Sequence, residues 1–142
     1  MEFEEFVAAR MPALLRFATV VTGDPEYATE VVLAALVKAG RHWRGIRRMP
    51  GPEDQLKRLI IAEYLSWRRR KAVRALPPTE PPADEDLDAE LWTALAGLAP
   101  RQRVVLALRF FELLGPDEIA ELLGWREAEV RTLGARGMAA LR

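Results

Sequence analysis

The chain of 142 residues contains no cysteine and a single histidine, His42. The absence of cysteine excludes disulfide bonds and thiolate metal sites. With one histidine and one serine, Ser66, the chain also lacks the side chains from which Ser–His and Cys–His catalytic pairs are built. His42 stands among arginines, so we interpret it as a surface residue or a phosphate contact. We therefore expect no metal, no cofactor and no enzyme activity.

Long apolar runs are missing as well. The N-terminus, MEFEEF, is acidic, and no stretch has the length and hydropathy of a signal peptide or a membrane span. Half of the residues are hydrophobic and 30% are charged, which is typical of a globular protein. We expect a protein without a membrane segment in a reducing, cytoplasmic setting.

The formal net charge is zero, but the charge is unevenly distributed. Residues 41–74 contain 11 basic and 3 acidic side chains, a net charge of +8. A strongly basic segment within a neutral chain indicates a surface that binds a polyanion.

Two helices are expected before the basic segment. The first covers residues 2–21, and the second begins with Asp24 as its N-cap and Pro25 in its first turn. In the second helix residues 31–37 are apolar on every side. This pattern fits a buried helix, and it fits equally a helix whose outer face meets another protein.

The helix expected from residue 55 to about residue 75 combines aromatic rings with arginines, ending in Trp67 and Arg68–Arg70. Rings beside guanidinium groups suit a parted nucleic-acid strand, because a ring can stack on any base. In the alternative interpretation the aromatic rings, including Trp43 and Tyr64, belong to the core and the arginines form a solvated face.

A linker is predicted at residues 76–86. Four prolines fall within residues 77–82, which prevents a helix and favours an extended chain. The linker separates two small helical domains, residues 1–75 and 87–142, so the predicted fold class is all-α.

The C-terminal part contains a helix-turn-helix pattern over residues 116–136. Pro116 suits the first helical turn, and Gly124 suits the left-handed residue that ends a helix. Val130, Leu133 and Met138 of the second helix should point inward, as should Phe111 of the preceding helix. The alternative is an ordinary helical hairpin.

Together these segments resemble the extracytoplasmic-function (ECF) group of bacterial RNA polymerase sigma factors, in particular its actinobacterial sigma-E-like members. FEEFVAARMPALLRFATVVTGDPEYATEVVLAALVKA and LKRLIIAEYLSWRRRKAVR are similar to the start and end of region 2. LAGLAPRQRVVLALRFFELLGPDEIAELLGWREAEVRTLGARGMAALR is similar to region 4. The resemblance implies binding to core RNA polymerase, opening of the −10 promoter element by region 2 and recognition of the −35 element by region 4. It leaves open an anti-sigma or other regulatory protein partner.

The resemblance also implies three sets of site residues. The −10 set is Trp43, Arg44, Arg47, Arg48, Arg58, Tyr64, Trp67, Arg68, Arg69 and Arg70. The −35 set is Arg126, Glu129, Arg131, Thr132 and Arg136. The polymerase-binding set is Glu30, Val31, Leu33 and Ala34.

Three segments depart from the family pattern. Leu33 and Ala34 replace a Gln-Glu pair, Ala62 replaces an asparagine, and the recognition helix opens with glutamates. We interpret Glu127 as structural, because it can pair with Arg131 four residues later. These departures motivate an alternative function, a degenerate sigma-like protein that acts through protein–protein contact without promoter-specific initiation. A self-standing helix-turn-helix regulator would leave the basic segment unexplained.

Overall fold

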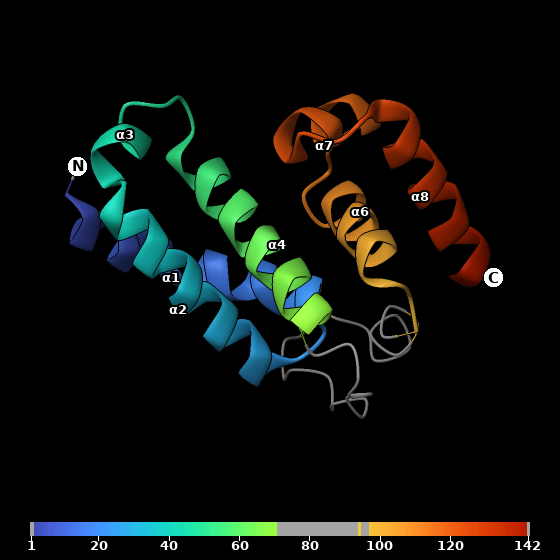
Figure 1. Ribbon diagram of the computed structural model, residues 1–142, viewed down its shortest axis with the longest axis horizontal. Coiled ribbons are helices and arrows are strands. Elements are labelled where there is room, and N and C mark those ends of the chain that lie inside the picture. The colour runs from blue at the N-terminus through green and yellow to red at the C-terminus, as the bar shows by residue number, and fades with distance from the viewer. Residues whose placement is uncertain (1, 71–93, 95–96, 142) are drawn as a thin grey trace. The chain divides into compact units, whose positions relative to one another are not determined.

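The computed structural model describes residues 2–70, 94 and 97–141, with only the backbone described at residues 67–70. Within these ranges every regular element is a helix (Figure 1), which confirms the all-α fold class. The chain divides into two compact units, Met1–Val73 and Arg74–Arg142. The predicted linker at 76–86 lies outside the described residues, so its boundaries stay a prediction.

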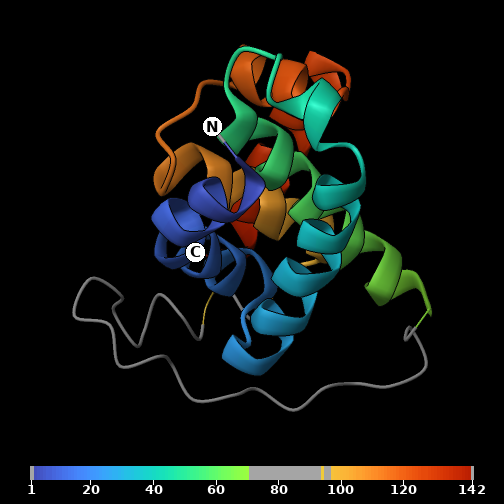
Figure 2. The same ribbon diagram turned by 90° about the vertical axis from the view of Figure 1, so that its left-hand side faces the viewer.

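Three long helices form the core of the N-terminal unit: α1 (Phe3–Thr22), α2 (Pro25–Arg41) and α4 (Pro52–Arg70). They lie against one another in both views (Figure 1 and Figure 2). The short helix α3 (Trp43–Ile46) follows α2. All three long helices contribute fully buried side chains, namely Leu14, Val21, Val31, Val32, Leu56 and Ile60. The N-terminal unit therefore has its own hydrophobic core.

The corner between α1 and α2 is determined by local sequence. Gly23 ends α1 in the left-handed conformation, with φ 77°, and its N–H donates to the carbonyl of Thr19 at 2.9 Å. The Asp24 carboxylate then accepts hydrogen bonds from the backbone N–H groups of Glu26, at 3.0 Å, and Tyr27, at 3.4 Å. Pro25 occupies the first turn of α2. The predicted start of the second helix is confirmed.

The C-terminal unit contains α6 (Pro100–Phe110), α7 (Pro116–Leu123) and α8 (Glu127–Leu141). Pro116 begins α7, and Gly124 ends it with φ 71° and a hydrogen bond to the carbonyl of Ala120 at 2.9 Å. Helix α8 starts three residues later and packs against both α6 and α7. This arrangement agrees with the predicted helix-turn-helix.

Two side chains expected in this core are exposed instead. Helix α6 ends at Phe110, so Phe111 lies beyond the helix and is exposed. Met138 is also exposed, because Gly137 is the residue of α8 that faces α6. A Cβ added at Gly137 would lie 2.9 Å from Cδ1 and 3.2 Å from Cγ of the buried Leu106. The two helices approach closely at this glycine.

This close approach predicts opposite effects for two neighbouring glycines. We expect Gly137→Ala to lower the free energy of unfolding of the C-terminal unit by about 1–3 kcal/mol, because the new methyl group overpacks Leu106. The matched control is Gly134→Ala, whose Cβ would lie 3.6 Å from Val105 Cγ1, an ordinary contact. It should stabilise α8 by up to about 1 kcal/mol through helix propensity. Hydrogen exchange of the α6 and α8 amides measures both. Equal effects at the two glycines would contradict this packing.

Candidate nucleic-acid and polymerase interfaces

The basic surface of the N-terminal unit is built on α3 and the turn that follows it. Trp43 and Ile46, three residues apart, are buried against the unit. Arg44, Arg47 and Arg48 lie between and after them and are exposed. We call these three arginines the basic turn. Because the apolar residues of α3 face inward, the charges of the basic turn face solvent.

Two aromatic rings that were expected to stack on bases belong to the core. The Trp43 side chain is only 8% exposed, and its ring lies 5.5 Å from Phe3 and 4.9 Å from Phe6 between centroids. Tyr64 is also buried, with its ring 6.2 Å from that of Tyr27. Neither Trp43 nor Tyr64 presents a ring face to a ligand. We therefore replace the stacking role by a packing role for these two residues.

The remaining members of the −10 set divide into two groups. Arg58 is exposed on α4. Trp67 and Arg68–Arg70 belong to the last turn of α4, but their side chains lie outside what the structure describes. Their role stays a prediction.

The basic turn is not neutralised by acids of the part of the chain that the structure describes. No ion pair there involves Arg44, Arg47, Arg48 or Arg58. Two acids of α4 pair with other bases, Glu53 with Arg10 at 3.8 Å and the buried Glu63 with Lys38. Among the described residues, no acid is paired with these four arginines.

The polymerase-binding set lies on α2 but does not form one face. Glu30 is exposed, Leu33 is 51% exposed and Ala34 is half-buried. Val31 is fully buried in the core and cannot contact a partner, so its assignment to this set is wrong. Val37, which the sequence interpretation missed, is 56% exposed one turn after Leu33. The i, i+4 spacing from Leu33 was the signal that could have identified it.

Both glutamates at the start of α8 are paired with arginines. Glu127 Oε1 accepts hydrogen bonds from Arg131 Nη2, at 2.7 Å, and Nε, at 3.2 Å. The predicted i, i+4 pair is therefore present. Glu129 accepts from Arg101 Nη1 of α6 at 2.7 Å. The Arg101 guanidinium also lies over the Trp125 ring, 4.8 Å from its centroid.

Two members of the −35 set, Glu129 and Thr132, make hydrogen bonds within the C-terminal unit. Glu129 joins α8 to the start of α6 through Oε1, while its side chain stays 39% exposed. A contact of Glu129 with DNA stays a prediction. The Thr132 hydroxyl donates to the carbonyl of Ala128 at 2.9 Å, and the residue is exposed. Arg136 is exposed on α8, and Arg126 is exposed immediately before the helix begins.

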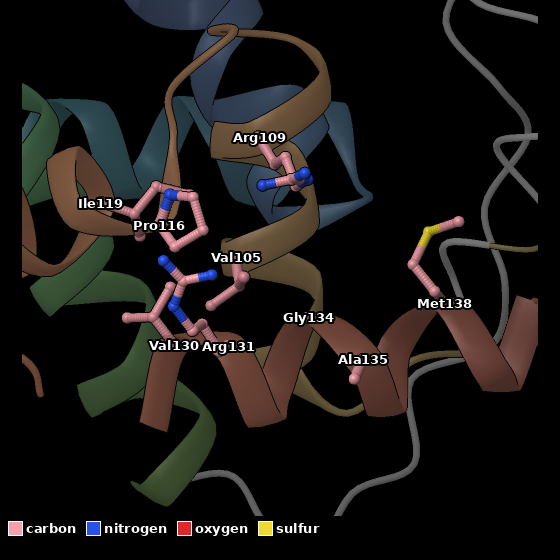
Figure 3. Close-up of a pocket in the computed structure, with 9 residues that line it drawn as sticks. All are labelled: Val105, Arg109, Pro116, Ile119, Val130, Arg131, Gly134, Ala135 and Met138. Carbon is pink, nitrogen blue, oxygen red and sulfur yellow. The ribbon is translucent and has the colours of Figure 1, made fainter. Parts of the chain in front are cut away.

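A shallow cavity of about 270 Å³ lies between α6, α7 and α8 (Figure 3). Its floor is apolar, and Arg109 and Arg131 stand around it together with Pro116 at the start of α7. Arg109 was not identified from the sequence. The prediction for this helix used the spacing of its apolar residues, which does not indicate what a charged residue between them contacts. The cavity places Arg109 on the same side of the unit as Arg131.

The described residues contain no cluster of His, Asp and Glu side chains that could hold a metal ion. None of the described helices is long and apolar enough to cross a membrane.

Comparison with known proteins identifies the family. Residues 88–141 match the family model described as Sigma-70, region 4. The whole chain is 34% identical, over 151 residues, to RNA polymerase sigma-E factor of Streptomyces avermitilis, and covers 84% of that protein. It is 32% identical over 150 residues to RNA polymerase sigma-E factor of Streptomyces coelicolor and covers 85% of it. The chain belongs to the ECF sigma factor family, in its sigma-E-like group. Sigma factors are transcription initiation factors and not enzymes.

Solved structures agree on the fold of this sigma factor. The sigma factor RpoE of Bartonella quintana, solved in complex with the anti-sigma factor NepR, superposes with a TM-score of 0.77 at 18% identity. The comparison covers 98% of this chain and 93% of that one. The PhyRSL–NepR complex from Sphingomonas sp. Fr1 gives a TM-score of 0.72 at 23% identity, covering 99% and 87% of the two chains.

The burial of Trp43 in this sigma factor predicts that the residue acts on stability. We expect Trp43→Ala to destabilise the N-terminal unit by about 3–5 kcal/mol, because it leaves a cavity between α1 and α3. Trp43→Phe, which keeps a ring against Phe3 and Phe6, is the control and should cost much less. Hydrogen exchange of the α1 and α4 amides measures the loss. If Trp43→Ala left stability unchanged but weakened binding to single-stranded DNA, the packing role would be refuted.

Proposed function

We propose that this sigma factor binds core RNA polymerase and directs initiation at specific promoters. Its N-terminal unit engages the −10 element and its C-terminal unit reads the −35 element. The observation that carries the proposal is the basic turn, whose three arginines are exposed and have no acidic partner among the described residues. Exposed arginines are suited to phosphates, whose condensed counterions they release on binding.

In the −10 complex the basic turn and Arg58 hold the backbone of the parted strand. Base stacking then falls to Trp67, because Trp43 and Tyr64 are committed to the core. A single stacked base is worth about 1–3 kcal/mol. The strand is then held mainly by charge, and Arg68–Arg70 are proposed to add to it.

In the −35 complex the first turns of α8 enter the major groove, as recognition helices of helix-turn-helix proteins do. Arg126, Arg131, Thr132 and Arg136 supply the base and phosphate contacts. Arg109 joins them as a phosphate contact, since it stands at the cavity beside Arg131. Phosphate contacts fix the register of the helix, and base contacts supply specificity.

The outward face of α2 supplies the polymerase contact. The exposed Leu33 and Val37 lie one turn apart, with Glu30 on the same side of the helix. Fully burying such an aliphatic side chain contributes about 1.5–3 kcal/mol. An apolar contact here replaces the polar Gln-Glu contact typical of the family. By analogy with the Bartonella protein, an anti-sigma or other regulatory protein is also proposed as a partner.

The same apolar face supports the second candidate function. A degenerate sigma-like protein would use Leu33 and Val37 to bind a regulatory protein and would not bind polymerase. The two functions differ in whether the full chain forms an active holoenzyme.

The test is reconstitution with core RNA polymerase. We expect the protein to co-elute with core polymerase and to direct run-off transcription from a subset of promoter fragments. The double variant Leu33→Ala, Val37→Ala should bind core polymerase at least about tenfold more weakly, because it removes most of the apolar contact. Its fold should be unchanged, since both side chains are more than half exposed. Met49→Ala, which truncates another exposed apolar side chain of the same unit, is the matched control.

Two results would contradict the proposal. If the protein neither bound core polymerase nor shifted any promoter fragment at low salt, the degenerate function would replace it. If the double variant bound core polymerase as tightly as the unmodified protein, the contact would lie on another face.

A further inference from the structure

The pair formed by Glu127 and Arg131 occupies the part of α8 that would enter the major groove. Both side chains are well exposed, 48% for Glu127 and 63% for Arg131. They lie one turn apart in the first half of the helix, where recognition helices contact base edges. The pair is therefore presented to DNA as a unit.

The hydrogen bonds of this pair use only one edge of the guanidinium. Glu127 Oε1 accepts from Nε and Nη2 of Arg131. Nη1 and the second hydrogen of Nη2 form the other edge, which this contact does not use. Two parallel N–H groups on that edge match the O6 and N7 acceptors of guanine in the major groove.

Glu127 is poorly suited to read a base by itself. Its Oε1 already accepts two hydrogen bonds, and a carboxylate close to the phosphate backbone is repelled unless its charge is compensated. Held against Arg131, the carboxylate is compensated, and the long arginine side chain is restrained to one direction. The neighbouring Glu129 has a different task, because it is bonded to Arg101 of another helix.

We infer that Glu127 is a positioning residue that holds Arg131 in the orientation for reading a guanine in the −35 element. The inference rests on the proposed promoter recognition by the C-terminal unit and deepens it. Arg131 is the specificity-determining contact, and Glu127 acts through it.

An exposed i, i+4 pair contributes little to folding stability. The effect of Glu127 is therefore expected in base preference and not in the stability of α8. This separates a positioning role from a merely structural one.

The experiment selects −35 duplexes from a randomised library with the full chain in its holoenzyme. Affinities are then measured for the four bases at each selected position. Arg131→Ala should abolish a guanine preference at one position, a loss of about 5- to 150-fold for a bidentate contact. Glu127→Ala should reduce the preference for guanine at that same position several-fold, with unchanged hydrogen exchange in α8. Glu127→Gln, which keeps the acceptor oxygen, should retain part of the preference.

The double variant Glu127→Ala, Arg131→Ala tests the coupling. It should match Arg131→Ala alone, because Glu127 has no role once Arg131 is gone. The inference is overturned if Glu127→Ala leaves the guanine preference unchanged. It is also overturned if Glu127→Ala changes the preference at a different base pair, since Glu127 would then read a base directly. A uniform loss of affinity over all sequences in Arg131→Ala would show a phosphate contact and overturn it too.

The outcomes distinguish this inference from the function on which it rests. If the holoenzyme selects a −35 motif and its guanine preference is unchanged in Glu127→Ala, the inference is overturned and the proposed function is not. A holoenzyme that selects no −35 sequence overturns both.

Discussion

The burial of Trp43 between Phe3 and Phe6 is the contact on which the basic surface of the N-terminal unit depends. The indole ring joins α3 to the start of α1. A helix of four residues has little stability of its own, because its few hydrogen bonds do not offset the entropy of forming it. Packing of Trp43 and Ile46 therefore orients α3, and this orientation turns Arg44, Arg47 and Arg48 to solvent.

The two units differ in which basic side chains their acids pair with. In the described part of the N-terminal unit, Glu53 pairs with Arg10 and Glu63 pairs with Lys38. In the C-terminal unit the acids at the start of α8 pair with Arg101 of α6 and with Arg131 of α8 itself. The ion pairs of Glu53 and Glu63 in the described part of the N-terminal unit do not use the arginines of the basic turn, which suits a surface that binds a phosphate backbone. The pairs of the C-terminal unit restrain individual side chains, which suits the reading of bases.

The sequence was sufficient where a local rule decides the structure. Asp24, Pro25, Pro116 and Gly124 have strong preferences for helix ends, and the structure places each at the end that was predicted. The helix-turn-helix and the all-α fold followed from these residues and from the spacing of apolar side chains.

The sequence was insufficient where packing against a distant helix decides which side faces inward. The apolar run of α2 did not distinguish the buried Val31 from the exposed Leu33 and Val37. In α8 the close contact at Gly137 turned Met138 outward, and a glycine gives no hydrophobic signal.

The sequence likewise predicted only part of the candidate site. The arginines of the basic turn were identified from the charge of their segment. A charged side chain is expected on the surface because burying it costs desolvation free energy. The burial of Trp43 and Tyr64 could not be decided, since an aromatic ring suits a core and a stacked base equally well. The pairing of Glu129 with Arg101 joins residues 28 positions apart, beyond the reach of any local pattern.

The most direct test of the account is the salt dependence of strand binding by the holoenzyme. The affinity for a single-stranded −10 oligonucleotide is measured against salt concentration for the unmodified protein and for the triple variant Arg44→Ala, Arg47→Ala, Arg48→Ala. Each lost phosphate contact lowers the slope of log affinity against log salt by about 0.7, so the account predicts a slope smaller by about 2. An unchanged slope would show that the basic turn does not hold the strand.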